Sequence, residues 1–175
     1  MDISAMNMFL SEDNIKRHLE HYRTQKSRLS IIEKSFPIIK GRSIGEICRL
    51  SIDRTARAEA MWLMWYIESH GCFFDSFSLS PEKTEIISKS YSSREKFLYE
   101  IYLEAMKREH GFLYIYLDKG TPKIMFEAEP NIAFFKVKPM LCLDLYEHTY
   151  FSDYIFGKDK FVRSALSYLN TGKLK

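Results

Sequence analysis

The chain has 175 residues, of which 46% are hydrophobic, 28% charged and 15% aromatic, a composition typical of a folded globular protein and not of a disordered one. This length suits one domain or two small lobes that share a sizeable core. The formal net charge of +3 is too small to indicate nucleic-acid binding, and the longest apolar stretch, AMWLMWYI, is too short to span a bilayer. We therefore expect no nucleic-acid or membrane partner.

The N-terminal sequence and the cysteines indicate in which cellular compartment the protein is expected. No basic segment with a long apolar core begins the chain, which argues against a signal peptide. The cysteines Cys48, Cys72 and Cys142 are odd in number, widely spaced and without a CxxC pair, which favours reduced thiols over a disulfide framework. These features predict a cytoplasmic protein.

Helices are expected throughout the N-terminal half. Residues 12–35 follow a good N-cap, Ser11, begin with an acidic turn and precede Pro37, which would end the helix. Ser43 could cap a short helix after that. Residues 52–78 are rich in alanine and then in aromatic side chains, and they indicate one further long helical stretch.

The second half begins after a linker around Pro81. Ser92 and Glu95 have the spacing of a capping box, which predicts that a helix starts there. Apolar residues then recur at helical spacing, and Gly111 is a suitable residue to end the helix.

Three short strands are expected next. Residues 112–118, 123–129 and 132–138 are rich in aromatic and β-branched side chains, and KGTP between the first two predicts a hairpin turn. A last helix is expected over residues 158–170. The sum is an α+β fold: an N-terminal helical hairpin, then an α/β lobe with a three-stranded antiparallel sheet flanked by helices. We expect a helical lobe over 1–80 and the α/β lobe over 81–175.

The candidate chemistry is metal binding. Asp144 and His148 are four residues apart, so a carboxylate and an imidazole could converge on one cation, but two ligands do not complete a site. His18 and His70 are further candidates, although each histidine taken alone is more often structural than a ligand. No GxSxG, HExxH, P-loop or GxGxxG motif occurs.

At these residues the sequence resembles the iron/manganese superoxide dismutases. PMLCLDLYEHTYFSDY is similar to the family's C-terminal motif, in which Asp, an aromatic residue, Glu and His follow in the same order. LSEDNIKRHLEHY is similar to the family's first helix and SHGCFFDSF to its second ligand segment. GFLYIYL and KFVRSALSYLN resemble the first strand and the closing helix. The resemblance covers nearly the whole chain, and it implies that four residues hold a metal between the two lobes: His18, His70, Asp144 and His148.

The resemblance also implies an activity and an assembly. Three histidines and one carboxylate suit one iron or manganese ion per subunit. Such an ion would oxidise one superoxide to oxygen and reduce another to hydrogen peroxide. The family's glutamate at the position of Glu147 contacts the ligand histidine of a second subunit. This implies a homodimer in which Glu147 contacts the partner subunit's His148.

Several positions around the ligands depart from the family. On the first helix the family has a second histidine and an entrance tyrosine four and eight residues after the first ligand, where this chain has Tyr22 and Lys26. The family's glutamine that hydrogen-bonds the solvent on the metal is missing, because Tyr66 stands at one of its two usual places and EAEPN at the other. The chain's single glutamine is Gln25.

The aromatic surroundings differ as well. Phe74, Phe112 and Tyr146 stand where the family prefers tryptophan, and Phe151 replaces a tyrosine. Tyr146 could add a hydroxyl near the metal. We therefore take Lys26, Tyr22, Tyr66 and Tyr146 as candidate catalytic residues.

Three interpretations follow. The chain is a divergent superoxide dismutase, or a metal-binding relative with weak or different redox activity, or a non-catalytic structural protein. Structural zinc is an alternative occupant of the same ligands.

Overall fold

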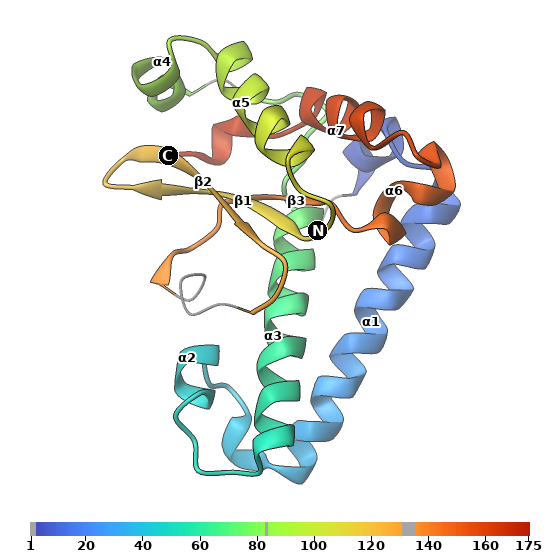
Figure 1. Ribbon diagram of the computed structural model, residues 1–175, viewed down its shortest axis with the longest axis vertical. Coiled ribbons are helices and arrows are strands. Elements are labelled where there is room, and N and C mark those ends of the chain that lie inside the picture. Colours follow the sequence, from blue (N-terminus) through green and yellow to red (C-terminus); the bar gives the residue numbers. More distant parts are fainter. Residues whose placement is uncertain (1–2, 83, 131–135) are drawn as a thin grey trace.

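The computed structural model describes residues 3–82, 84–130 and 136–175. Its N-terminal half is built on two long helices that lie side by side, α1 (Glu12–Ser35) and α3 (Arg54–Phe74), with the single-turn α2 (Ile44–Ile47) at their far end (Figure 1). A 3-10 turn, η1 (Ser4–Met8), precedes α1, and another, η2 (Pro37–Ile39), follows it. The expected helical hairpin is confirmed.

The caps of these helices explain where they start. The Ser11 hydroxyl accepts a hydrogen bond from the N–H of Asn14, as expected for the N-cap of α1. At α2 both halves of a capping box form between Ser43 and Glu46. Asp53 caps α3 by accepting from the N–H of Ala56.

The C-terminal half holds a three-stranded antiparallel sheet of order β2-β1-β3, made of β1 (Phe112–Asp118), β2 (Thr121–Glu127) and β3 (Leu141–Asp144). Helices α4 (Glu85–Tyr91), α5 (Arg94–Met106), α6 (Glu147–Tyr154) and α7 (Lys158–Ser167) flank it, and η4 (Thr171–Lys173) follows α7. The long helix pair extends away from the sheet on the side opposite α5 and α7 (Figure 1). The predicted α+β class is confirmed.

The hairpin between β1 and β2 turns on two residues. Lys119 and Gly120 have φ of 49° and 77°, and Asp118 pairs with Thr121 directly before and after them. Left-handed backbone at both central positions is the geometry that matches the twist of the strands. The turn predicted from KGTP is confirmed.

The predicted boundaries of α5 are wrong at both ends. Ser93, not Ser92, caps the helix by accepting from the N–H of Lys96. Ser92 is instead the C-cap residue that follows the unpredicted α4, with φ of 68°. The helix ends at Met106, and Gly111 lies at the entry to β1, where its φ of 129° and a Phe126 ring atom 2.6 Å from any added Cβ explain the glycine.

The third predicted strand was placed on the wrong segment. Residues 132–135 of the expected strand 132–138 lie outside the described residues, and 136–138 are not in a strand. The third strand is Leu141–Asp144, which pairs with Phe112–Ile115 of β1. The four β3 residues are all buried, because α3 covers them, so they show no alternation by which a strand is recognised.

A continuous apolar core joins α3, the sheet, α5 and α7, with buried rings such as Trp65, Phe73, Phe112 and Phe161. The division into lobes 1–80 and 81–175 stays a prediction. Among the helices in the described part of the chain, none has both the length and the apolar character needed to cross a membrane.

Candidate metal centre

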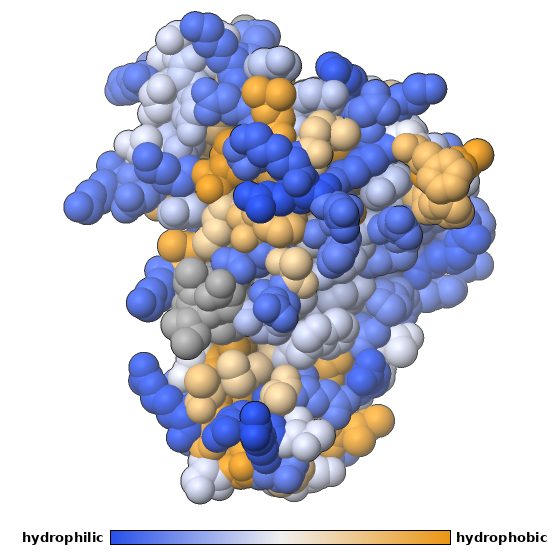
Figure 2. Space-filling model, in the orientation of Figure 1, coloured by the Kyte–Doolittle hydropathy of each residue, from blue (hydrophilic) through white to orange (hydrophobic). Residues whose placement is uncertain are grey.

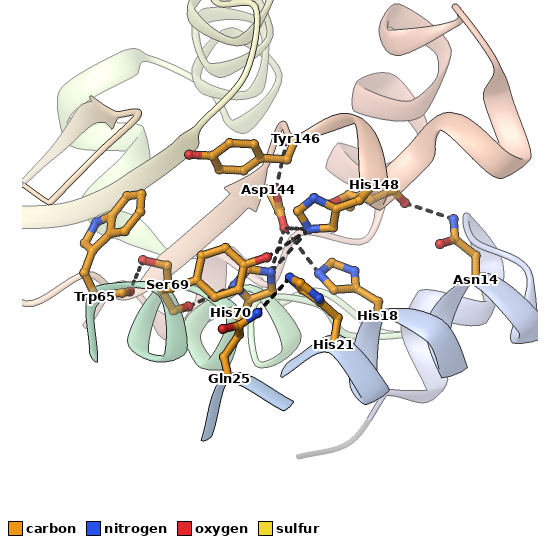
Figure 3. Close-up of polar contacts among 12 residues, drawn as sticks. Asn14, His18, His21, Gln25, Trp65, Ser69, His70, Asp144, Tyr146 and His148 are labelled. Atoms are coloured by element: carbon orange, nitrogen blue, oxygen red, sulfur yellow. Dashed lines mark hydrogen bonds and ion pairs between the residues drawn. The ribbon is translucent and has the colours of Figure 1, made fainter. Parts of the chain in front are cut away.

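Four side chains from four different elements meet where α1, α3, β3 and α6 approach one another (Figure 3). They are His18 of α1, His70 of α3, Asp144 at the end of β3 and His148 in the first turn of α6. Their ligand atoms all lie within 4.8 Å of one another. The four residues that the resemblance named as ligands are thus brought together by the fold.

The carboxylate of Asp144 is at the centre of this cluster. Its Oδ2 lies 3.3 Å from His18 Nε2, 3.3 Å from His70 Nε2 and 3.5 Å from His148 Nε2. The other oxygen, Oδ1, accepts a hydrogen bond of 3.0 Å from the backbone N–H of Tyr146. This bond orients the carboxylate so that Oδ2 faces the three imidazoles.

The hydrogen bonds of His70 determine which of its nitrogens can bind a metal. Its Nδ1–H donates to the carbonyl oxygen of Tyr66 at 2.9 Å, so Nε2 presents a lone pair to the cluster. That lone pair faces the Oδ2 of Asp144, and two acceptors at this distance repel unless a cation or a proton lies between them. An outer hydrogen bond of this kind is the usual way to orient a ligand histidine.

Unsatisfied buried atoms support the same conclusion. Among the described residues, both ring nitrogens of His18 and the Oδ2 of Asp144 are buried and lack a hydrogen bond of acceptable geometry. Buried polar atoms without partners are costly, and one cation would satisfy both the Nε2 of His18 and the Oδ2 of Asp144, which lie 3.3 Å apart. Three imidazole nitrogens and one carboxylate oxygen are a ligand set that fits iron or manganese.

The charges of the cluster also suit a cation. Burial acts to raise the pKa of Asp144, but His148, His18 and His70 outweigh it and hold this pKa well below its usual value. Burial lowers the pKa of His70 to about 3. The cluster therefore combines an ionised carboxylate with a neutral imidazole at neutral pH.

Metal binding by the apoprotein is expected to weaken on acidification. Burial acts to lower the pKa of His148, but Asp144 outweighs it and raises the pKa above the ordinary 6.5. Because a ligand histidine must be neutral, protons compete with the metal below this pKa, by about tenfold per pH unit. Calorimetric titration with Mn²⁺ between about pH 8 and about pH 5 measures this. An affinity independent of pH over this range would contradict the assignment of His148.

Tyr66 and Tyr146 both pack against the ligands but direct their hydroxyls differently. The Tyr66 ring centre is 4.0 Å from that of His70, and its hydroxyl is 3.4 Å from His148 Nε2. The Tyr146 ring stacks on His148, but its hydroxyl points away and donates to the carbonyl oxygen of Ala128 at 2.7 Å (Figure 3). The hydroxyl near the cluster is therefore that of Tyr66.

Tyr22 and Lys26 lie further along α1. The ammonium group of the exposed Lys26 lies over the Tyr22 ring, 5.4 Å from its centre. The Tyr22 ring packs edge-on against Phe74, and its centre is 6.5 Å from that of His70. Tyr22 thus lies beside the ligand His70, and Lys26 adds a positive charge beside Tyr22.

A cavity of about 400 Å³ connects the cluster with the surface. Its wall consists of Asn14, Arg17, His18, His21, Glu147, His148, Phe151 and Ser152. Of the ligands, His18 and His148 face this cavity. A small anion could approach them along the wall that includes Arg17.

His21 was not among the residues chosen from the sequence. Its ring centre lies 5.6 Å from that of His148, and its Nε2 is 3.5 Å from Nε2 of the buried Gln25. Arg28 orients Gln25 by donating to its Oε1 at 3.0 Å. The signal was available in the sequence, because residues three apart share a helix face and His21 follows His18 by three.

The C-terminal part of the chain matches a known protein family. Residues 80–174 match the family model of the iron/manganese superoxide dismutases, C-terminal domain. A search of curated proteins found no match to the chain. The matched segment includes Asp144 and His148 and covers more than half of the chain, whereas His18 and His70 precede it.

Proposed function

Because the chain belongs to the iron/manganese superoxide dismutase family, we propose that it converts superoxide to oxygen and hydrogen peroxide at one metal ion per subunit. The observation that supports this most strongly is the cluster of three histidines and Asp144, in which the unpartnered buried atoms of His18 and Asp144 face each other. The proposed ligands are His18, His70, Asp144 and His148.

When bound, iron or manganese would supply the one-electron chemistry, since either metal alternates between two oxidation states. The protein groups would hold and orient it. The carboxylate of Asp144, which is itself fully buried, offsets positive charge, and the Tyr66 carbonyl holds His70 in one tautomer. The cavity beside Arg17 admits the superoxide anion.

Tyr66 is the proposed proton-holding group at the cluster. Burial, together with the charge of Asp144, raises its pKa far above the ordinary value for tyrosine, so the hydroxyl stays protonated. It is 3.4 Å from His148 Nε2 and can donate a hydrogen bond to an anion that enters there. We propose that it replaces the missing glutamine, and that Tyr146 acts only through its ring.

Replacing Lys26 with tyrosine is expected to increase superoxide turnover severalfold. The variant removes a positive charge beside Tyr22 and restores the neutral hydroxyl that the family has at this position. Steady-state superoxide consumption measures the effect. Lys26→Met is the matched control, because it removes the charge without adding the hydroxyl. If Lys26→Tyr turns over no faster than the wild type, Lys26 does not limit the reaction.

A homodimer is proposed from the surface of α6. Phe151, Ile155 and Phe156 are large apolar residues with exposed fractions of 46%, 59% and 90%. Figure 2 shows apolar surface over the turn that joins α6 to α7. Glu147 and Phe151 also line the cavity. A second copy seated here would cover this surface and bring Glu147 to the partner subunit's His148.

The second candidate function is a metal-binding protein with a different redox activity. The presence of a phenol at position 66 in place of the usual glutamine favours it, because outer hydrogen bonds tune the redox behaviour of a metal. Bound metal measured together with superoxide turnover distinguishes the two functions. A cytoplasmic location, based on the reduced cysteines, remains part of the proposal.

A further inference from the structure

Two of the three cysteines lie together behind the metal centre. Cys72 is in α3 and Cys142 is in β3, and the hydroxyl of Ser76 connects their backbones. It donates to the carbonyl oxygen of Cys72 at 2.7 Å and accepts from the N–H of Cys142 at 2.7 Å. The two side chains therefore start from neighbouring points on α3 and β3, whose backbones a single hydroxyl bridges.

The two thiols differ in exposure. Cys72 is half-buried, whereas Cys142 is fully buried. A partly accessible thiol beside a second thiol is the arrangement in which a first oxidation product is converted to a disulfide. Cys48 is exposed, but it lies at the end of α2, at the far end of the helix pair.

We propose that Cys72 and Cys142 form a peroxide-sensitive pair, whose disulfide weakens metal binding at the neighbouring cluster. The Cys72 thiolate attacks hydrogen peroxide, the O–O bond breaks, and Cys72 becomes a sulfenic acid as hydroxide leaves. The Cys142 thiol then attacks that sulfur, the S–S bond forms, and the sulfenic oxygen leaves as water. In total two thiols lose two electrons to one peroxide, and two waters form.

The effect on the metal site follows from position. Cys72 is two residues after His70, and Cys142 is two residues before Asp144. A disulfide requires about 2.05 Å between sulfurs, which is much shorter than the separation of two thiols that are not bonded to each other. Bond formation therefore draws α3 and β3 together, while ligand distances tolerate changes of only about 0.2 Å. We expect metal affinity to fall at least about tenfold.

The test uses the full chain as purified, reduced and freed of reductant, then treated with hydrogen peroxide. Alkylation of the remaining thiols and mass spectrometry of the peptides are expected to find a Cys72–Cys142 disulfide within one chain. In the Cys142→Ser variant, oxidation of Cys72 should stop at the sulfenic acid, which a dione reagent traps. The Cys48→Ser variant should form the disulfide as the wild type does. Added peroxide tests this pair without requiring dismutase activity, so its outcome is separate from that of the proposed function.

Metal retention is measured on the same samples with a chromogenic chelator. The wild type is expected to release metal after peroxide treatment, and Cys142→Ser, which receives the same peroxide but cannot form the disulfide, should retain it. The proposal is overturned if Cys72 and Cys142 remain alkylatable while Cys48 is oxidised. It is also overturned if both proteins release metal equally.

Discussion

The His70→Ala variant is expected to fold and to contain almost no bound metal. His70 is fully buried, and its Nε2 lies 3.3 Å from the Oδ2 of Asp144, so alanine removes one nitrogen from the cluster without replacing it. Loss of a direct ligand should exceed the roughly 10–100-fold loss of affinity that changes to outer partners cause. Metal content per chain, measured after growth with added iron and manganese, gives the result.

Two further variants make this prediction decisive. Asp144→Asn removes the charge of the cluster while keeping its volume, and it should also lose metal even if His70→Ala folds poorly. His110→Ala is the control, because His110 packs against Tyr146 but is not a member of the cluster. Normal metal content in His70→Ala, with circular dichroism like that of the wild type, would refute the ligand assignment.

Tyr66→Phe is expected to retain metal and to lose about tenfold in superoxide turnover. The ring that packs on His70 remains, and only the hydroxyl 3.4 Å from His148 Nε2 is removed. Because burial keeps this hydroxyl protonated, its loss removes a donor at the cluster. Turnover divided by metal content is the quantity to compare.

Tyr146→Phe is the matched control for this variant. The Tyr146 ring also packs on a ligand, His148, but its hydroxyl donates to the carbonyl oxygen of Ala128. Removing this hydroxyl should therefore leave turnover per metal near that of the wild type. Its cost is the loss of one hydrogen bond, worth about 1 kcal/mol of stability. Equal losses of turnover in the two variants would show that Tyr66 has no special part in the reaction.

Local signals in the sequence were enough to predict the elements that depend on neighbouring residues. Ser11 and the acidic first turn place the start of α1, and the residues KGTP place the hairpin. The start of α5 was missed by one residue because Ser92 and Ser93 can each cap a helix. The choice depends on α4, whose end occupies Ser92. The choice between the two serines therefore depends on where the preceding helix ends, which the residues around the cap do not specify.

The same distinction applies to the metal centre. Asp144 and His148 are four residues apart, so their spacing alone shows that both side chains could reach one cation. His18 and His70 join them only through the packing of α1 and α3 against β3 and α6, and here the family resemblance was needed. The direction of the Tyr146 hydroxyl could not be predicted, because it depends on the position of the Ala128 carbonyl in a different segment.

The most direct test of the proposed function measures bound metal and superoxide consumption on the same purified sample. We expect about one iron or manganese ion per chain and rapid, catalytic loss of superoxide that disappears when the metal is removed and returns when it is restored. Stoichiometric metal with no catalytic turnover would contradict the dismutase function and favour the second candidate. A chain that binds neither metal after supplementation would contradict both.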